Sequence, residues 1–405
     1  MKKLEKSVPV IRFKGFSEAW EQRKLSSLLS FSNGINAPKE HYGKGRKMIS
    51  VMDILDEKPV KYEFIRNSVQ VDKKIESKNK VEYGDIVFVR SSEVPEEVGW
   101  AKAYLEKEYA LYSGFSIRGK KINEFNPYFV ELTLNSINRK QIERKAGGST
   151  RFNVSQTILS SIELLMPEIE EQNKIDKFFI QLDTTIALHQ RKLDALKLMK
   201  KGFLQQMFPK IEADIPEIRF ADFDGKWEQR KLGEIFNERS ERSADGELIS
   251  VTINSGVIKA SKLEKKDNSS FDKSNYKVVK KGDIAYNSMR MWQGASGYSS
   301  YDGILSPAYT VIYPRKDIDT IFIAYMFKKI DMIQTFQRNS QGLTSDTWNL
   351  KFPSLSTIKI KIPANDEQIK ITNLFQKLEY TSILHQNQIE MLKKVKKAYL
   401  QTMFI

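Results

Sequence analysis

The chain contains nearly the same segment twice, so it must fold as two related units. Residues 8–29 return 207 positions later as residues 215–236, and eleven of the twenty-two aligned positions are identical. Average composition gives about one chance identity in such a window. A second match joins PEIEEQNKI at 167–175 with PANDEQIKI at 363–371, at a shift of 196. A period near 200 residues is too long for a solenoid repeat, so each copy is a domain-sized unit with its own core.

The composition indicates a basic protein with a polyanionic partner. The net charge is +15 and the isoelectric point is near 9.4, and neutralising phosphates with release of counterions supplies most non-specific affinity for nucleic acid. A lysine-rich proteome would give the same charge, so charge alone leaves both explanations open. The chain has no cysteine and three histidines, which excludes disulfides and thiolate metal sites. No apolar run reaches the ~20 residues of a membrane span, and no apolar stretch follows the N-terminal lysines. We therefore expect a cytoplasmic protein.

Each copy has the pattern of a mixed α+β module. The copies share a strand region, a Gly-Asp turn followed by an apolar strand, and a short helix, at 48–54 and 248–254, 83–90 and 281–288, and 128–136 and 321–328. Gly-Asp supplies the turn chemistry. Each copy then reaches a polar, glycine-bearing loop, at 145–153 or 338–349, and ends in an apolar strand before Pro167 or Pro363.

A long helix is predicted after each of these prolines, because apolar residues recur there at alternating spacings of three and four. The predicted seam positions are Ile175, Phe179, Leu182, Ile186, His189, Leu193, Leu196, Lys200, Phe203 and Met207 in the first copy and Ile371, Phe375, Leu378, Ser382, His385, Ile389, Leu392, Lys396, Tyr399 and Met403 in the second. The seams must be buried, most simply against each other. Lys200, Lys396, His189 and His385 are interpreted as polar residues that set the register, with the lysine stems extending outward. A pH-sensitive or metal-binding pair is the alternative.

The expected fold class is therefore α+β, with two pseudo-two-fold-related α/β domains joined by two long antiparallel helices that form a coiled coil. The helices are expected to be antiparallel because the first leads directly into the second copy. The expected domains are residues 1–166, 167–210, 211–362 and 363–405. Residues 175–207, at about 1.5 Å per residue, would span about 48 Å.

A search for catalytic motifs argues against an independent enzyme. No G-x-x-x-x-G-K-[ST] phosphate loop occurs, and no G-x-G-x-x-G follows a strand. Asn126-Pro127-Tyr128-Phe129 resembles the base-holding loop of adenine methyltransferases but lacks its second proline, and the second copy has Asp319 and Thr320 instead. A helix start with proline in its first turn is the better interpretation. Asp85 and Asp283 follow glycine at a turn, where a turn-stabilising role is expected.

Polar and basic residues suited to DNA cluster in two places in each copy. Arginine suits guanine, Asn and Gln suit adenine, and Ser and Thr suit either. One cluster follows each Gly-Asp strand and the other lies in each glycine-bearing loop. The candidate DNA-binding residues are Arg90, Ser91, Ser92, Ser149, Thr150 and Arg151 in the first copy, and Asn287, Ser288, Arg290, Trp292, Gln293, Gln341, Thr344 and Ser345 in the second. Ordinary solvated loops are an equally open interpretation of any single residue.

Taken in order, these motifs resemble the specificity subunits of type I restriction–modification systems, over essentially the whole chain. The motifs are the duplicated opening (Trp20–Leu25, Trp227–Leu232), the Gly-Asp-Ile strands (Gly84–Ile86, Gly282–Ile284) and the helix starts (Pro167, Glu171, Gln172 and Ile175; Pro363, Glu367, Gln368 and Ile371). The resemblance implies two target-recognition domains that each read half of a bipartite double-stranded DNA target, with helices that set the spacer.

The resemblance also implies partners. Two adenine-methylating subunits would dock on the helices, and two restriction and translocase subunits would join them for cleavage. S-adenosylmethionine, ATP and Mg²⁺ would be bound by those partners, so the chain itself is expected to have no cofactor, no metal and no catalytic residue. Two alternatives remain from the residues alone: an autonomous DNA-modifying enzyme, and a coiled-coil scaffold that binds DNA without reading sequence.

Overall fold

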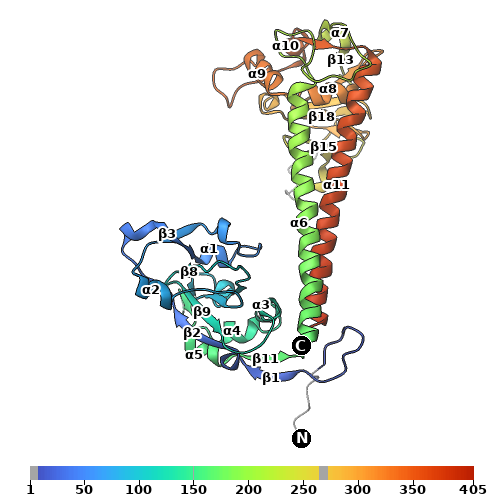
Figure 1. The fold of residues 1–405 in the computed structure, drawn as a ribbon. Helices are drawn as coiled ribbons and strands as arrows, with labels where there is room; N and C mark the ends of the chain where they lie inside the picture. The colour runs from blue at the N-terminus through green and yellow to red at the C-terminus, as the bar shows by residue number, and fades with distance from the viewer. Residues whose placement is uncertain (1–7, 149, 264–271) are drawn as a thin grey trace. The chain divides into compact units, whose positions relative to one another are not determined.

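The computed structural model describes residues 8–148, 150–263 and 272–405. The chain divides into two compact units, the first formed by Met1–His189 with Gln388–Ile405 and the second by Gln190–Asn387. Each unit therefore contains one α/β region and parts of both long helices (Figure 1). The four domain boundaries expected from the sequence are finer than this division and stay a prediction.

Unit 1 is built around a four-stranded antiparallel sheet of order β2-β9-β5-β7, beside a three-stranded sheet of order β4-β3-β8. Its elements are β1 (Glu21–Lys24), β2 (Leu29–Asn33), β3 (Tyr42–Ile49), α1 (Val51–Ile54), β4 (Asn67–Val69), α2 (Lys73–Lys78), β5 (Ile86–Val89), β6 (Ser91–Ser92), β7 (Ala101–Ala103), β8 (Leu111–Tyr112), β9 (Ser116–Lys121), α3 (Pro127–Asn135), α4 (Arg139–Lys145), β10 (Phe152–Asn153), α5 (Gln156–Ser160), β11 (Glu163–Met166) and the first part of α6 (Ile169–Gln206).

Unit 2 repeats the four-stranded sheet in the order β13-β20-β17-β18, with the two-stranded sheets β14-β15 and β16-β19. Its elements are β12 (Glu228–Lys231), α7 (Leu232–Ile235), β13 (Phe236–Glu238), β14 (Ile249–Thr252), β15 (Gly256–Lys259), β16 (Lys277–Val279), β17 (Ile284–Asn287), the 3-10 turn η6 (Met291–Gln293), β18 (Ser296–Tyr298), β19 (Gly303–Leu305), β20 (Tyr309–Pro314), α8 (Thr320–Met326), α9 (Ile330–Asn339), α10 (Phe352–Ser356), β21 (Lys359–Ile362) and most of α11 (Asn365–Thr402).

The repeated opening segment forms the same short strand pair in both units. Strand β1 pairs antiparallel with β11, the strand that precedes α6 (Figure 1). Strand β12 pairs in the same way with β21, which precedes α11. Trp20, just before β1, is buried against Phe129 and against Phe404 at the end of α11. The opening motif thus fastens the start of each unit to the strand that leads into a helix.

The end of each long helix completes the core of a unit. In unit 2, Phe208 at the end of α6 contacts Trp227 and stacks on Phe322 at 5.2 Å between ring centroids. In unit 1, Phe404 holds the same position beside Trp20 and stacks on Phe129 at 5.3 Å. This explains why the segments that end α6 and α11 match in sequence.

A buried ion pair fixes each helix start. Arg12 donates from two nitrogens to both carboxylate oxygens of Glu171, each at 2.7 Å, and Glu171 is 1% exposed. Arg219 binds Glu367 in the same manner, at 2.8 and 2.7 Å. Bidentate geometry of this kind is specific as well as strong. The Glu of the repeated Glu-Gln motif is therefore the anchor of the opening segment.

The adjacent glutamine of each motif ties the helix start to a neighbouring helix. Gln172 accepts from the backbone N–H of Asn126 at 2.9 Å, just before α3, and donates to the Pro167 carbonyl at 2.8 Å. In unit 2, Gln368 accepts from the N–H of Asp319 at 3.0 Å, just before α8. The whole Pro…Glu-Gln motif is thus a structural joint.

Helices α6 and α11 run side by side and antiparallel (Figure 1). Within unit 1, Lys396 donates to Asp183 at 2.6 Å, and within unit 2, Lys200 donates to Glu379 at 2.6 Å. As the number rises along α6 it falls along α11, which defines the antiparallel direction. All predicted seam positions are buried or half-buried. The α+β fold class with two long packed helices is confirmed, and the two lysines act as paired polar residues beside the seam.

One predicted strand region is partly wrong. Residues 48–49 belong to β3, but Val51–Ile54 form helix α1. Ser50 donates from its backbone nitrogen to the Asp53 carboxylate at 2.8 Å and from its hydroxyl at 2.6 Å. This capping box starts a helical turn where the apolar pattern had indicated a strand.

We predict that Phe404→Ala destabilises unit 1 by about 3–5 kcal/mol, because it leaves a cavity beside Trp20 and Phe129. Hydrogen exchange of the complete chain would measure the effect, as a loss of protection in α3. Phe208→Ala should act on unit 2 in the same way. The control is Met391→Ala, since Met391 is 61% exposed on α11 and its loss should change protection little. Equal loss of protection in all three variants would contradict the assigned packing.

Candidate functional site

In unit 1, short strand pairing brings the two candidate clusters together. Strand β6 pairs with β10, so that Ser91 lies opposite Asn153. Arg151 donates to the Ser91 hydroxyl at 3.0 Å, and its guanidinium lies 5.8 Å from the ring centroid of Phe115. Arg90 donates to the Gly114 carbonyl at 3.3 Å. The two arginines are therefore held on one surface, beside Gly114 and Phe115.

The remaining candidates of unit 1 differ in their surroundings. Ser92 donates to Glu97 at 2.6 Å and accepts from the N–H of Val94 at 3.1 Å, so its hydroxyl is engaged in a local turn. Thr150 is exposed. Ser149 lies outside the described residues.

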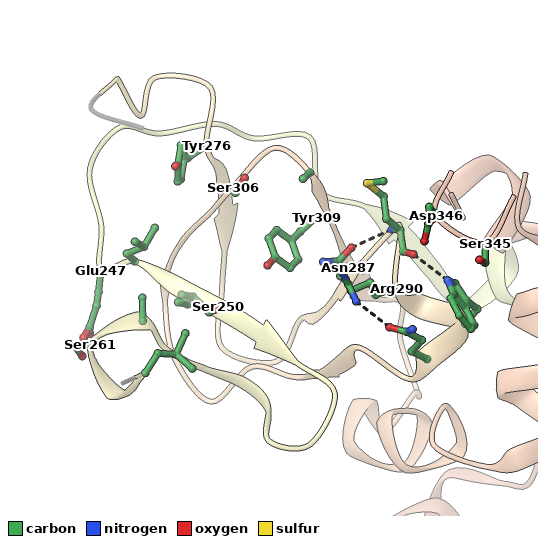
Figure 2. A pocket seen from close by; sticks show the side chains of 18 residues that line it. Glu247, Ser250, Ser261, Tyr276, Asn287, Arg290, Ser306, Tyr309, Ser345 and Asp346 are labelled. Atoms are coloured by element: carbon green, nitrogen blue, oxygen red, sulfur yellow. Dashed lines mark hydrogen bonds between the residues drawn. The ribbon is translucent and has the colours of Figure 1, made fainter. Parts of the chain in front are cut away.

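In unit 2, five of the eight candidates line one open hollow of about 930 Å³. They are Asn287, Arg290, Trp292, Gln293 and Ser345. Figure 2 shows Asn287 and Arg290 between Tyr309 and the loop that carries Ser345 and Asp346. The β17 end, η6 and the glycine-bearing loop thus face a common space.

Hydrogen bonds hold the turn after β17 in shape (Figure 2). Asn287 accepts from the N–H of Met289 at 3.0 Å, and Arg290 donates to the side-chain oxygen of Gln293 at 3.3 Å. Trp292 donates to the Met289 carbonyl at 3.0 Å and meets Trp348 edge to face at 5.2 Å. The tryptophan pair joins this turn to the glycine-bearing loop.

Three candidates of unit 2 do not line the hollow. Ser288 is buried, and its hydroxyl is 2.8 Å from that of Thr310, so it supports the turn from behind. Gln341 pairs through its backbone with Asn349 at the base of the loop. Thr344 is exposed and its carbonyl accepts from Thr347 at 3.0 Å. Tyr309 and Asp346 also line the hollow, although the sequence did not single them out. Tyr309 is brought there by its strand pairing with Asn287, which local sequence spacing does not reveal.

Lys328 links the turn after β17 to the rest of unit 2. Its ammonium donates to the Gly294 carbonyl at 2.6 Å and to the Ile253 carbonyl at 3.2 Å. Gly294 ends η6 with φ +83°, a conformation that favours glycine. Burial, with a smaller contribution from Lys200, lowers the pKa of Lys328 to about 8. The turn that carries Trp292 is therefore held by a partly buried cation.

The carboxylates considered as catalytic candidates have structural partners. Asp85 accepts from the N–H of Glu82 at 3.0 Å, and Asp283 accepts from the N–H of Lys280 at 2.9 Å, so each closes its turn. Asp283 also binds Arg239 through both oxygens. Burial raises the pKa of Asp85. Asp283 does not line the hollow of unit 2.

The Asn126-Pro127 segment is a helix start. The Asn126 side-chain oxygen accepts from the N–H of Phe129 at 3.0 Å, which caps α3, and Asp319 accepts from the N–H of Phe322 at 2.9 Å before α8. A base-holding role would need this amide to be available. Its nitrogen instead donates to Asp176 at 2.8 Å.

Over 8–148, 150–263 and 272–405, no three His, Cys, Asp or Glu side chains gather in a way that could hold a metal ion. Of the helices described, none combines the length and the apolar character that crossing a bilayer requires.

A duplicated α/β unit that includes stretches of two long packed helices defines a class of two-domain α+β proteins, and comparison with known proteins gives the family. The family model described as "Type I restriction modification DNA specificity domain" matches residues 18–198 and again 224–394. The chain belongs to this family and carries its domain twice. Specificity subunits of this family are not catalytic, and the cofactors of a type I system belong to its other subunits.

A relative and two solved structures from type I systems have low sequence identity to this chain. A putative type I restriction enzyme MjaX specificity subunit from Methanocaldococcus jannaschii is 25% identical over 227 residues. That match covers 53% of this chain and about half, 52%, of the relative. The crystal structure of a type I restriction-modification S subunit from M. genitalium is 16% identical, with a TM-score of 0.58 over 98% of this chain and 99% of that one.

A second solved structure has the same fold. It comes from work titled as the basis of complex assembly and conformational transition of the type I R-M system. It is 13% identical, with a TM-score of 0.53 over 94% of this chain and 96% of that chain. At such identities the likeness establishes the fold and leaves the recognised sequence open.

We predict that the stability of unit 2 rises between pH about 8 and 10.5 through Lys328. The unfolded chain keeps this proton up to the ordinary lysine pKa of 10.5, whereas the folded chain releases it near 8. The unfolded state therefore binds more protons in this window, and the free energy of unfolding increases with pH. Urea unfolding followed by tryptophan fluorescence would measure it, with Lys328→Met as the control that lacks this component. An identical rise in the variant would exclude Lys328 as its source.

Proposed function

We propose that this chain is the DNA-recognition subunit of a type I restriction–modification complex, with each α/β region reading one half of a bipartite target. The proposal rests on the hollow of unit 2. There Arg290, which is suited to contact guanine, lies with Asn287 and Gln293, which are suited to contact adenine. In unit 1, Arg90 and Arg151 lie on one surface with Ser91. The loops differ between units while the frame is shared, which suits two readers of different sequences.

The long helices would set the spacer between the half-sites. Each spans 38 residues and packs on the other, so a change in helix length should be transmitted to the separation of the half-sites. The faces turned away from the seam carry exposed apolar side chains. Leu198 is 72% exposed, Tyr380 63% and Ile383 58%. Such residues on a helix favour a protein partner, here the adenine-methylating subunits.

The remaining partners follow from that assembly. Two methylating subunits would supply S-adenosylmethionine chemistry, and two restriction and translocase subunits would supply ATP and Mg²⁺ chemistry. The chain would act in the cytoplasm, where its DNA target lies. A coiled-coil scaffold that binds any duplex is the competing function, and the high positive charge alone would satisfy it.

We predict that Arg290→Ala and Gln293→Ala alter one half of the methylated target and leave the other half unchanged. Each loss of a base contact should cost about 1–3 kcal/mol of discrimination at one position. The measurement is the methylome of cells that express the full chain with its methylating subunits. Arg230→Ala is the matched control, because Arg230 is exposed on β12 and pairs with Glu228. Methylation without any sequence preference would support the scaffold instead.

Deleting one heptad from each helix should shorten the spacer. Residues 189–195 and 385–391 occupy equivalent positions in the two copies. Their removal shortens each helix by about 10 Å, or about three base pairs of DNA. The same methylome measurement should therefore report a spacer about three base pairs shorter. A methylated target with its original spacer would show that the helices do not set it.

A further inference from the structure

Strand β3 of unit 1 contains an unusually large bulge. Tyr42 and Arg46 both lie opposite Val69 of β4, so the residues Gly43, Lys44 and Gly45 between them have no partner in the ladder. Gly43 and Gly45 have φ of +82° and +80°, and a Cβ on Gly45 would lie 2.6 Å from the Val69 carbonyl oxygen. Only glycine suits that position. Bulges often re-aim a side chain beside a functional site, and here the side chain is Lys44.

Lys44 differs from its basic neighbour Arg46. Arg46 pairs with Glu108 at 2.7 Å and with Glu76 at 3.6 Å, and its guanidinium lies over the ring of Tyr109. Lys44 is exposed, and within the described part of the chain no carboxylate lies within ion-pair distance of it. The Arg46 charge is therefore paired within the protein, whereas the Lys44 charge is available to an anion.

An amide-lined hollow of about 730 Å³ lies beside the bulge. Its lining includes Lys44, the amide side chains of Asn33, Asn36, Gln70 and Asn79, and one carboxylate, Asp72. The Asn36 side chain is exposed and, among described residues, makes no hydrogen bond to protein. Asn and Gln side chains carry the paired donor and acceptor that match an adenine edge.

One lining residue of this hollow, Asn36, lies beside the arginine cluster of the same unit. The Asn36 amide lies directly over Gly114, since a Cβ placed there would be 1.9 Å from its oxygen. The carbonyl of Gly114 accepts from Arg90 at 3.3 Å, and the next residue, Phe115, lies under Arg151. Gly114 thus joins two surfaces that the sequence places far apart.

The hollow of unit 2 is also lined by residues from a strand region and from a turn. It joins Asn287, the last residue of β17, and Arg290 in the turn that follows with Ile249 and Ser250 of β14. Residues 248–254 are the copy of residues 48–54, which begin at the end of β3. In unit 2, therefore, the loop after the Gly-Asp strand and the β14 region border one hollow, and in unit 1 the β3 bulge borders a hollow of its own.

We infer that the Gly43–Lys44–Gly45 bulge and the amide-lined hollow form a second part of the duplex-DNA surface of unit 1. In it, Lys44 contacts a backbone phosphate and Asn36 contacts an adenine edge. Phosphate contacts position the protein and base contacts specify the sequence, so the two residues have separable effects. The inference rests on the proposed function and extends its reading surface beyond Arg90, Ser91 and Arg151.

The phosphate contact is tested by the salt dependence of binding of the full chain, with its methylating subunits, to a random-sequence duplex. Lys44→Ala should lower the slope of log affinity against log salt by about 0.9, the value for one phosphate. Lys58→Ala is the control, because Lys58 is exposed in the same unit but does not line the hollow. An unchanged slope for Lys44→Ala overturns the phosphate contact. Thermal unfolding should be the same for all three proteins, since both lysines are exposed.

The base contact is tested by the methylome. Asn36→Ala should reduce discrimination for adenine by about 5- to 150-fold at one position of one half-site, whereas Asn123→Ala, exposed elsewhere in unit 1, should leave the target unchanged. An unchanged target for Asn36→Ala, with an altered one for Arg90→Ala, overturns the inference and leaves the proposed function intact. A wild-type chain that directs no sequence-specific methylation removes the proposed function, and this inference with it.

Discussion

The architecture depends on the closure of each core by the end of a long helix. Phe404 and Phe208 lie against Trp20 and Trp227, in aromatic clusters that also include a residue of α3 or α8. Aromatic side chains bury large areas and prefer specific angles, so such clusters fix orientation as well as stability. The Arg12–Glu171 and Arg219–Glu367 pairs then tie the opening segment of each unit to the first turn of its long helix. Because a lone buried carboxylate is costly, neither member of these pairs can be lost cheaply.

The glycine-bearing loops differ between the units and are mostly exposed, although Met291 of η6 lies in the core of unit 2. Unit 1 builds its surface from the two-residue strands β6 and β10, whereas unit 2 uses η6 and the Trp292–Trp348 contact. Both surfaces follow equivalent buried strands, β5 and β17. Each strand is preceded by a turn in which an aspartate accepts a backbone hydrogen bond. Surface loops on a rigid frame tolerate substitution and carry specificity. The pattern of conserved frame and divergent loops between the two copies is thus a consequence of where the apolar contacts lie.

The sequence predicts the frame well, because repetition and periodicity report burial directly. The heptad seam is visible as spacing, and the helix start at Asn126 is visible as a proline in the first turn. Helix α1 was missed because a capping box at Ser50 and Asp53 outweighs a short apolar pattern. The site was predicted only in part. Long-range pairings decide which residues meet, so the position of Tyr309 opposite Asn287, the burial of Ser288 and the role of Gly114 could not be obtained from local spacing.

The identical joints of the two units have a consequence for how such chains can change over generations. The Glu-Gln motif and the terminal phenylalanine of one copy would pack in the same way against any α/β region that keeps the matching arginine and tryptophan. A recombination event that exchanges the coding segment between two such joints would therefore deliver a folded hybrid in a single step. New target specificities would then arise by exchange of whole α/β regions, without the accumulation of point mutations in a loop.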